Sequence, residues 1–428
     1  MHFNHLYVNI LCMEKLIRRI QLEKLKKLLV KFPVVGVVGA RQVGKTTLVK
    51  DLLSDKDRLY FSFDDPAVVL TAKTNPYNFL KQADFITIDE VQKLPEILTT
   101  IKRIIDEKRI AGEFLLTGSA NITFLPKISE TLAGRIVFLE LMPFTIFELT
   151  SKLKDTPYSI EIIKSKNAKN CWDYLNSFKP HKIDFKKLIF RGGFPEAWFI
   201  NDTSLRQEWF KGYIRTYLER DVRDLSHIQR LYDYQKFLSL SAFRCSQILN
   251  RAELAKDSGI PYTTANHYLD LLLATFQVFL IPPYFKNIGK RLIKSPKLIW
   301  NDTGLALYLQ GINNWQDAER LGRISFLVEN KIILELKTLL SVYLPLAKLF
   351  YWRTSAGAEV DLIVEYNQRL IPIEIRWSET VGYKDIVGLL SFMNDFKKRV
   401  SFGIVLYTGK QVLKFKENIF LVPYERFL

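Results

Sequence analysis

The stretch Pro33–Val49, with the sequence PVVGVVGARQVGKTTLV, decides the fold of this chain. Its apolar run ends at Gly39, and Gly44-Lys45-Thr46 opens a helix-like pattern after four intervening residues. This is the G-x-x-x-x-G-K-[ST] pattern of a phosphate-binding loop, in the strand-then-helix setting that the loop requires. Glycines let the backbone curl so that its N–H groups face an anion, and the helix N-terminus adds its dipole. The sequence therefore predicts a site for a nucleoside triphosphate. The alternative is a plain glycine-bearing loop with a solvated lysine.

Individual residues of this loop have predicted roles. Lys45 is placed to reach the β- and γ-phosphates, and Thr46 is placed to hold Mg²⁺. ATP is favoured over GTP because the chain lacks an Asn-Lys-x-Asp motif, which reads guanine. The residues expected to contact the nucleotide are Gly39, Ala40, Arg41, Gln42, Val43, Gly44, Lys45, Thr46 and Thr47.

An acidic pair, Asp89-Glu90, follows the short apolar run Phe85–Ile88, which is typical of a buried strand. Asp89 is expected to hold Mg²⁺, and Glu90 is expected to orient or deprotonate the attacking water. A third strand ends in Thr117 and Ser119, either of which is a candidate for positioning that water. The pattern therefore predicts hydrolysis as well as binding. The alternatives are an acidic helix cap at the pair and an ordinary polar turn after the third strand.

The bulk composition bounds the class of protein. A chain of 428 residues with 48% hydrophobic residues is expected to fold into two or three globular domains. Its three cysteines lie far apart, which argues against a disulfide framework and fits a cytoplasmic protein. No apolar stretch approaches the length of a membrane helix, so no transmembrane segment is expected. The net charge of +17 favours a polyanionic partner, nucleic acid first and an anionic membrane surface second. A basic surface that serves only solubility is the alternative.

Alternating strand and helix patterns indicate an α/β fold over the first third of the chain. Such alternation predicts a parallel sheet covered by helices, with ligands at the carboxyl ends of its strands. The expected strands lie near 34–38, 59–63, 85–88, 113–117 and 136–141.

A helix-turn-helix is predicted between Ala252 and Leu273, where a glycine turn separates two helical patterns and the second begins after Pro261. Strand-like runs at 276–281 and 297–300 would form a wing beside it. DNA contacts are expected at the start of the second helix and on the wing. The alternative is a lid or protein-docking unit. The candidate contacts are Thr263, Thr264, Asn266, His267, Lys290, Arg291 and Lys294.

Three further strands are expected near the C-terminus, at 349–353, 358–365 and 369–377. Strand alternation places Glu359 and Asp361 on one face, and it places Glu374 and Arg376 together on the next strand. Carboxylates on adjacent strands beside a cation are typical of a metal-dependent nuclease site. Charged residues on an edge strand would look the same.

Taken together, these motifs resemble a prokaryotic family, the AAA+-type P-loop ATPases whose C-terminal part is a domain of unknown function, DUF4143. The resemblance implies an AAA-type ATPase core, an α-rich winged-helix domain and a C-terminal α/β domain similar to restriction endonucleases. The matching segments are Gly39–Thr47, Ile88–Gln92, Leu116–Ser119, Leu132–Arg135, Gly192–Glu196, Tyr217–Arg223 and Tyr351–Asp361. The predicted domains are a leader at 1–13, the ATPase domain at 14–150, a connector or lid at 151–230, the winged helix at 231–318 and the nuclease-like domain at 319–428.

The resemblance also implies roles for residues that the patterns alone do not assign. Arg135 would stabilise transition-state charge, in its own subunit or a neighbour's, although it could equally cap a helix. Glu329, Asp361 and Glu374 match the acidic positions of the nuclease-like fold. Arg376 stands where such a site normally has lysine, and an arginine does not give up its proton. We therefore expect a degenerate nuclease fold that serves as a docking or DNA-gripping platform.

The sequence as a whole predicts a cytoplasmic, Mg²⁺-dependent ATPase that acts on a macromolecular partner, DNA before protein. One alternative is a DNA-binding regulator with ATP as a slowly hydrolysed switch, and another is an ATP-dependent nuclease. Assembly into a homo-oligomer is left open.

Overall fold

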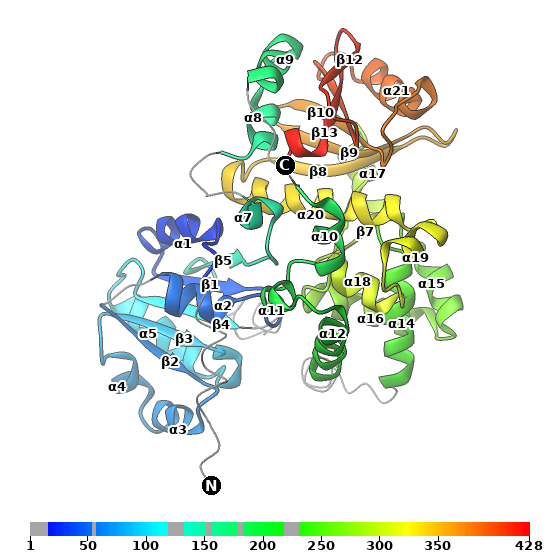
Figure 1. Ribbon diagram of the computed structural model, residues 1–428. Helices are drawn as coiled ribbons and strands as arrows, with labels where there is room; N and C mark the ends of the chain where they lie inside the picture. The colour runs from blue at the N-terminus through cyan, green and yellow to red at the C-terminus, as the bar shows by residue number, and fades with distance from the viewer. Residues whose placement is uncertain (1–15, 54–56, 119–131, 151–155, 178–182, 218–230) are drawn as a thin grey trace. The chain divides into compact units, whose positions relative to one another are not determined.

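The computed structural model describes residues 16–53, 57–118, 132–150, 156–177, 183–217 and 231–428 (Figure 1). They form two compact units. The first unit comprises the chain up to Gly39 and Gly44–Leu141, and the second comprises Ala40–Val43, Met142–Thr150 and the chain from Asp155 onward. The predicted leader lies outside the described residues, and the other predicted domain boundaries stay predictions.

The first unit is built on a five-stranded, all-parallel sheet with the strand order β2-β3-β4-β1-β5. All five strands were predicted close to their observed bounds, and the predicted α/β class is confirmed. β4 lies between β1, which leads into the phosphate loop, and β3, which ends in the acidic pair. The strands are β1 Val34–Val38, β2 Arg58–Ser62, β3 Phe85–Asp89, β4 Phe114–Gly118 and β5 Ile136–Glu140.

Helices connect these strands, and their apolar faces pack as the sequence periodicity requires. In α5, Ile97, Ile101 and Ile104 are buried because their spacing puts them on one face. In α3, Asp65 accepts a hydrogen bond from the backbone N–H of Ala67 and caps the helix. The helices are α1 Gln21–Leu29, α2 Lys45–Thr47, α3 Pro66–Thr74, α4 Pro76–Leu80 and α5 Ile97–Glu107, and α2 continues as a π-helical turn over Leu48–Leu52.

The second unit begins with a helical part that includes the predicted helix-turn-helix. Asn250 caps α15, and Gly259, with φ of 70°, ends it in the left-handed region that glycine favours. β6 and β7 pair as an antiparallel two-stranded sheet. The elements are α7 Ile146–Thr150, α8 Tyr158–Lys164, α9 Ala168–Ser177, α10 Phe185–Arg191, α11 Pro195–Phe199, α12 Thr203–Tyr217, α14 Leu231–Phe243, α15 Arg251–Ser258, α16 Tyr262–Ala274, β6 Val278–Ile281, α17 Ile288–Ile293, β7 Lys297–Trp300, α18 Thr303–Leu309 and α19 Trp315–Arg320.

The same unit ends in a six-stranded mixed sheet with the strand order β12-β13-β11-β10-β9-β8. β10 and β11 pair in parallel, as do β11 and β13, whereas the β8–β9–β10 meander is antiparallel. A core of apolar side chains from β8, β9 and α21 fills one face of the sheet. The elements are α20 Ile324–Tyr343, β8 Lys348–Arg353, β9 Glu359–Tyr366, β10 Arg369–Ile375, α21 Val387–Asp395, β11 Gly403–Tyr407, β12 Leu413–Lys416 and β13 Ile419–Pro423.

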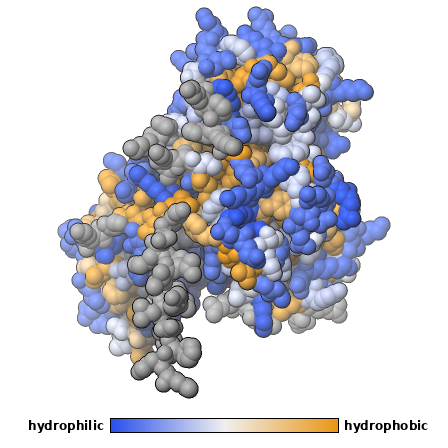
Figure 2. Space-filling view, in the orientation of Figure 1, coloured by the Kyte–Doolittle hydropathy of each residue, from blue (hydrophilic) through white to orange (hydrophobic). Residues whose placement is uncertain are grey.

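The visible surface of the second unit is rich in hydrophilic residues with apolar groups between them (Figure 2). Within the described part of the chain, no helix is both long and apolar enough to cross a membrane.

Candidate functional site

The phosphate loop connects β1 to α2 with the backbone geometry that anion binding needs. Gly44 has φ of 95° and ψ of 29°, a left-handed conformation that lets α2 begin directly after the turn. Lys45 is buried, and its Nζ donates a hydrogen bond to the carbonyl oxygen of Gly39 at 3.0 Å. The ammonium group is therefore held across the loop rather than extended into solvent.

Three hydroxyl groups surround the carboxylate of Asp89 at the end of β3. The hydroxyls of Thr46 and Tyr60 each donate to Oδ2 at 2.8 Å, and that of Thr117 donates to Oδ1. Burial, together with the hydrogen bond to Asp89, raises the pKa of Tyr60 well above its usual range, so its hydroxyl keeps its proton. The carboxylate is thus fixed in one orientation by three elements, α2, β2 and β4.

Tyr60 is a site residue that sequence reasoning missed. It lies in the middle of β2, and β2 is the edge strand next to β3. A tyrosine inside a strand has no motif of its own, and the order of strands in the sheet is needed to place it beside Asp89.

Glu90 lies directly after β3 with φ of 57° and ψ of 45°. A non-glycine residue seldom adopts this left-handed conformation, which occurs more often at functional sites. The backbone N–H of Glu90 donates to the hydroxyl of Thr117 at 3.3 Å, and the side-chain amide of Gln92 donates to the Glu90 carboxylate. Thr117 therefore contacts both members of the acidic pair. It does so from β4, which lies between β3 and the strand that leads into the phosphate loop.

Arg135 does not lie where its predicted role within one subunit requires. It precedes the amino end of β5, and β5 runs parallel to β1 in the register Val34↔Ile136 to Val38↔Glu140. At ~3.3 Å per residue, this edge is roughly 13 Å from the edge that carries the phosphate loop. Arg135 instead pairs with Asp106 at 2.7 Å. The prediction of a role in its own subunit is wrong, and a role in a neighbouring subunit stays a prediction. Ser119 lies outside the described residues.

The residues around Asp89 fit a nucleotide-bound Mg²⁺. Thr46 and Asp89 were predicted as its ligands, and their oxygens lie 2.8 Å apart at the carboxyl edge of the sheet. Hydroxyl and carboxylate oxygens are the donors that Mg²⁺ takes in addition to phosphate and water.

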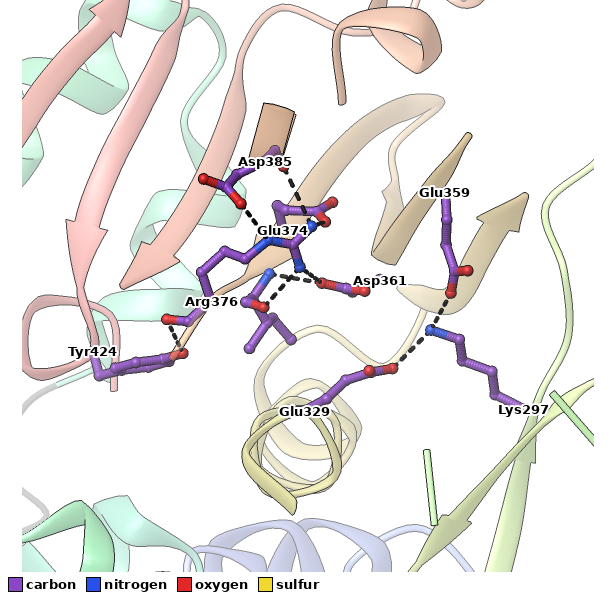
Figure 3. A network of polar contacts seen from close by, with 9 residues as sticks. Lys297, Glu329, Glu359, Asp361, Glu374, Arg376, Asp385 and Tyr424 are labelled. Carbon is purple, nitrogen blue, oxygen red and sulfur yellow. Dashed lines mark hydrogen bonds and ion pairs between the residues drawn. The ribbon is translucent and has the colours of Figure 1, made fainter. Parts of the chain in front are cut away.

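A second cluster of charged residues lies in the second unit, where α20, β7, β9 and β10 meet (Figure 3). It contains Glu329, Asp361, Glu374 and Arg376, the four residues of the expected degenerate nuclease site. Glu359 and Lys297 join them. The side chains border a cavity of about 820 Å³.

Lys297 begins β7 and points into this cluster. Its side chain is 3% exposed, and Nζ lies 2.8 Å from Oε1 of both Glu329 and Glu359. Burial by itself lowers the pKa of a lysine, but Glu329, Asp361 and Glu359 outweigh it and raise the pKa of Lys297 above its usual value. Lys297 therefore stays charged inside the cluster.

Arg376 is the second cation of the cluster. Its guanidinium pairs with Asp361 at 3.3 Å and also with Glu374. Burial, followed by the nearby charge of Asp361, raises the pKa of Glu374 well above its usual range. Among the described residues, no group of three or more His, Cys, Asp or Glu side chains is arranged to hold a metal ion. Lys297 and Arg376 instead pair with the carboxylates of the cluster.

The predicted DNA contacts of the helix-turn-helix differ in accessibility. Thr263 and His267 are exposed at the start of α16, and Thr264 is half-buried. Asn266 is half-buried as well, and its side-chain oxygen accepts a hydrogen bond from Arg251 at 3.2 Å.

The predicted contacts on the wing also differ in accessibility. Arg291 is not available for DNA, because its guanidinium pairs with Glu365 at 3.3 Å and lies over the ring of Tyr284. Lys294 is exposed. Lys290 belongs to α17, but its side chain lies outside the described part of the structure.

Comparisons with known proteins agree with this organisation. Residues 31–150 match the family model of the AAA domain, and residues 182–316 match a domain of unknown function, DUF8612. Residues 325–427 match a second domain of unknown function, DUF4143.

Relatives of similar length occur in bacteria and archaea. Uncharacterized proteins of Mycobacterium bovis and Mycobacterium tuberculosis are 29% identical over 412 residues, which cover 96% of this chain and 84% of theirs. An uncharacterized protein of Methanocaldococcus jannaschii is 24% identical over 400 residues, with coverages of 87% and 82%. The Walker-type ATPase of Pyrococcus abyssi aligns with a TM-score of 0.43 at 16% identity, over 70% of this chain and 97% of that one. The phosphate loop and the acidic pair therefore lie within a segment that is similar to the AAA domain, and the chain ends in a segment that is similar to DUF4143.

Proposed function

We propose that this protein hydrolyses ATP to ADP and phosphate with Mg²⁺. The observation that carries the proposal is the position of the Asp89 carboxylate. The hydroxyls of Thr46, Tyr60 and Thr117 hold it in one orientation, one residue before Glu90. Lys45 binds the phosphates, and Thr46 and Asp89 hold the metal ion. Glu90 takes the proton of the attacking water. Thr117 holds Asp89 and Glu90 in position through its hydrogen bonds with both. The metal ion, when bound, neutralises charge on the phosphates.

Purified protein is expected to release phosphate from ATP when Mg²⁺ is present and to stop when EDTA is added. The Lys45→Ala variant should lose most of this activity, because it lacks the ammonium group that lies across the loop where the phosphates bind. Lys50→Ala is a control, because Lys50 is exposed on the same helical segment but lies outside the loop. Turnover by Lys45→Ala at the wild-type rate would contradict the proposal.

We further propose that the ATPase acts on DNA, which binds at the start of α16. The exposed side chains of Thr263 and His267 support this, because the first turn of the second helix reads bases in helix-turn-helix proteins. The net charge of +17 supports a polyanionic partner as well.

Binding of a fluorescent DNA duplex should weaken as salt rises, because cations released from the phosphates drive the association. The double variant Thr263→Ala/His267→Ala is expected to bind less tightly, whereas Thr74→Ala, an exposed threonine in the first unit, should bind like the wild type. Equal affinity of all three proteins would reject α16 as the DNA-binding element. Stimulation of ATP hydrolysis by the duplex would connect the two activities.

A further inference from the structure

Oxygen atoms of Asp361, Glu374 and Ile375 accept hydrogen bonds from the guanidinium of Arg376. Nη1 donates to Asp361 Oδ2 at 3.3 Å and to the backbone carbonyl oxygen of Ile375 at 3.1 Å. Nη2 donates to Glu374 Oε1. Two carboxylates and a carbonyl oxygen are a donor set that a hard divalent cation also prefers. The arginine thus occupies the point that these oxygens surround.

The side chain of Arg376 is also held from outside the two strands. Nη2 donates to the backbone carbonyl of Asp385 at 3.3 Å, and Nε lies 3.7 Å from the Asp385 carboxylate. The hydroxyl of Tyr424 donates to the backbone carbonyl of Arg376 at 2.9 Å. Several contacts therefore keep the guanidinium in the cluster, as Figure 3 shows.

Lys297 is the counter-charge of the other two carboxylates, those of Glu329 and Glu359. Its ammonium group lies between Glu329 and Glu359, at 2.8 Å from each. Buried carboxylates require a nearby cation, because desolvation strongly disfavours their charged form when no counter-charge is present. One carboxylate oxygen, Glu374 Oε2, is buried and has no hydrogen-bond partner in the described part of the chain.

We infer that the side chains of Arg376 and Lys297 replace a divalent metal ion as the counter-charge of this cluster. The DUF4143 domain then holds no Mg²⁺ there, and the metal requirement of the protein belongs to the site around Asp89. A neutral side chain at position 376 would leave Asp361, Glu374 and the carbonyl of Ile375 without their cation, so that they could bind a divalent ion. Asp361 Oδ2 would keep its hydrogen bond from the backbone N–H of Ile375 at 2.8 Å, which holds the carboxylate in place.

Mn²⁺ binding, followed by electron paramagnetic resonance on nucleotide-free, full-length protein, tests this inference. Arg376→Gln is expected to bind one Mn²⁺ more than the wild type, and the added Asp361→Asn substitution should remove that extra ion. Arg399→Gln is a matched control, because Arg399 is equally half-buried and pairs with the Glu365 carboxylate at 2.6 Å on the same sheet. It should gain no ion.

Two results would overturn the inference. One is wild-type Mn²⁺ binding that Asp361→Asn reduces, because the cluster would then already accept a metal ion. The other is an Arg376→Gln protein with a wild-type circular dichroism spectrum and no additional Mn²⁺. If Arg376→Gln does not fold, the comparison of wild type with Asp361→Asn still decides the matter.

Discussion

Replacing Glu90 with glutamine is expected to lower kcat for ATP hydrolysis by about 10²–10⁴-fold, the range that a general base contributes. Glutamine keeps the shape of the side chain but cannot accept the proton of the attacking water. The affinity for ATP should change little, because Lys45, Thr46 and Asp89 hold the phosphates and the metal ion. Binding of a fluorescent ATP analogue and single-turnover phosphate release separate the two effects.

Glu96→Gln provides the control for this experiment. Glu96 is a nearby glutamate whose half-exposed side chain contacts Lys73 at 3.9 Å, away from the acidic pair. Its substitution should leave kcat unchanged. Normal turnover by Glu90→Gln would show that another group activates the water, and Glu90 would lose its assigned role.

Replacing Lys297 with methionine is expected to lower the free energy of unfolding of the second unit by about 3–5 kcal/mol, the cost of removing one partner from a buried ion pair. Methionine fills a similar volume, but it leaves the carboxylate of Glu329 without its counter-charge. Glu329 is almost fully buried, so water does not replace the lysine. Urea denaturation measures the loss, with the fluorescence of Trp300 and Trp352 among the reporting signals because both are buried in this unit.

Two further variants test the cause of that loss. Lys297→Met/Glu329→Leu should recover much of the stability, because an apolar pair can replace a buried ion pair at little cost. Lys294→Met, at an exposed lysine, should change the free energy of unfolding by no more than about 0.5 kcal/mol. Burial raises the pKa of Glu329 to about 8. A loss below about 1 kcal/mol in Lys297→Met would therefore mean that Glu329 takes up a proton when the lysine is removed, and the buried ion pair would lose its assigned role.

The features that the sequence predicted well are local ones. The phosphate loop, the five strands of the first unit and the two helices around Gly259 each have a pattern contained in a short segment. Because parallel strands bring their carboxyl ends to one edge, Lys45, Asp89 and Thr117 could be placed together before any geometry was known. The hydrogen bonds from Thr46 and Thr117 to Asp89 follow from that edge.

The residues that were misplaced depend on contacts between distant segments. Lys297 begins the strand-like run 297–300 of the expected wing, but its contacts with Glu329 of α20 and Glu359 of β9 turn it inward. Arg135 follows the third strand in the sequence, but the direction of β5 puts it at the opposite edge of the sheet. Arg291 likewise looked solvated until Tyr284 and Glu365 enclosed it.

The position of Lys297 has a consequence for how this chain can be divided. The match to DUF4143 begins at residue 325, whereas Lys297 belongs to the segment 182–316 that matches DUF8612. A fragment cut at the boundary between these families would carry Glu329 and Glu359 away from the lysine that neutralises both. The two matched segments therefore meet inside one compact unit, and a fragment that contains only one of them is expected to fold stably only if the lost charge is compensated.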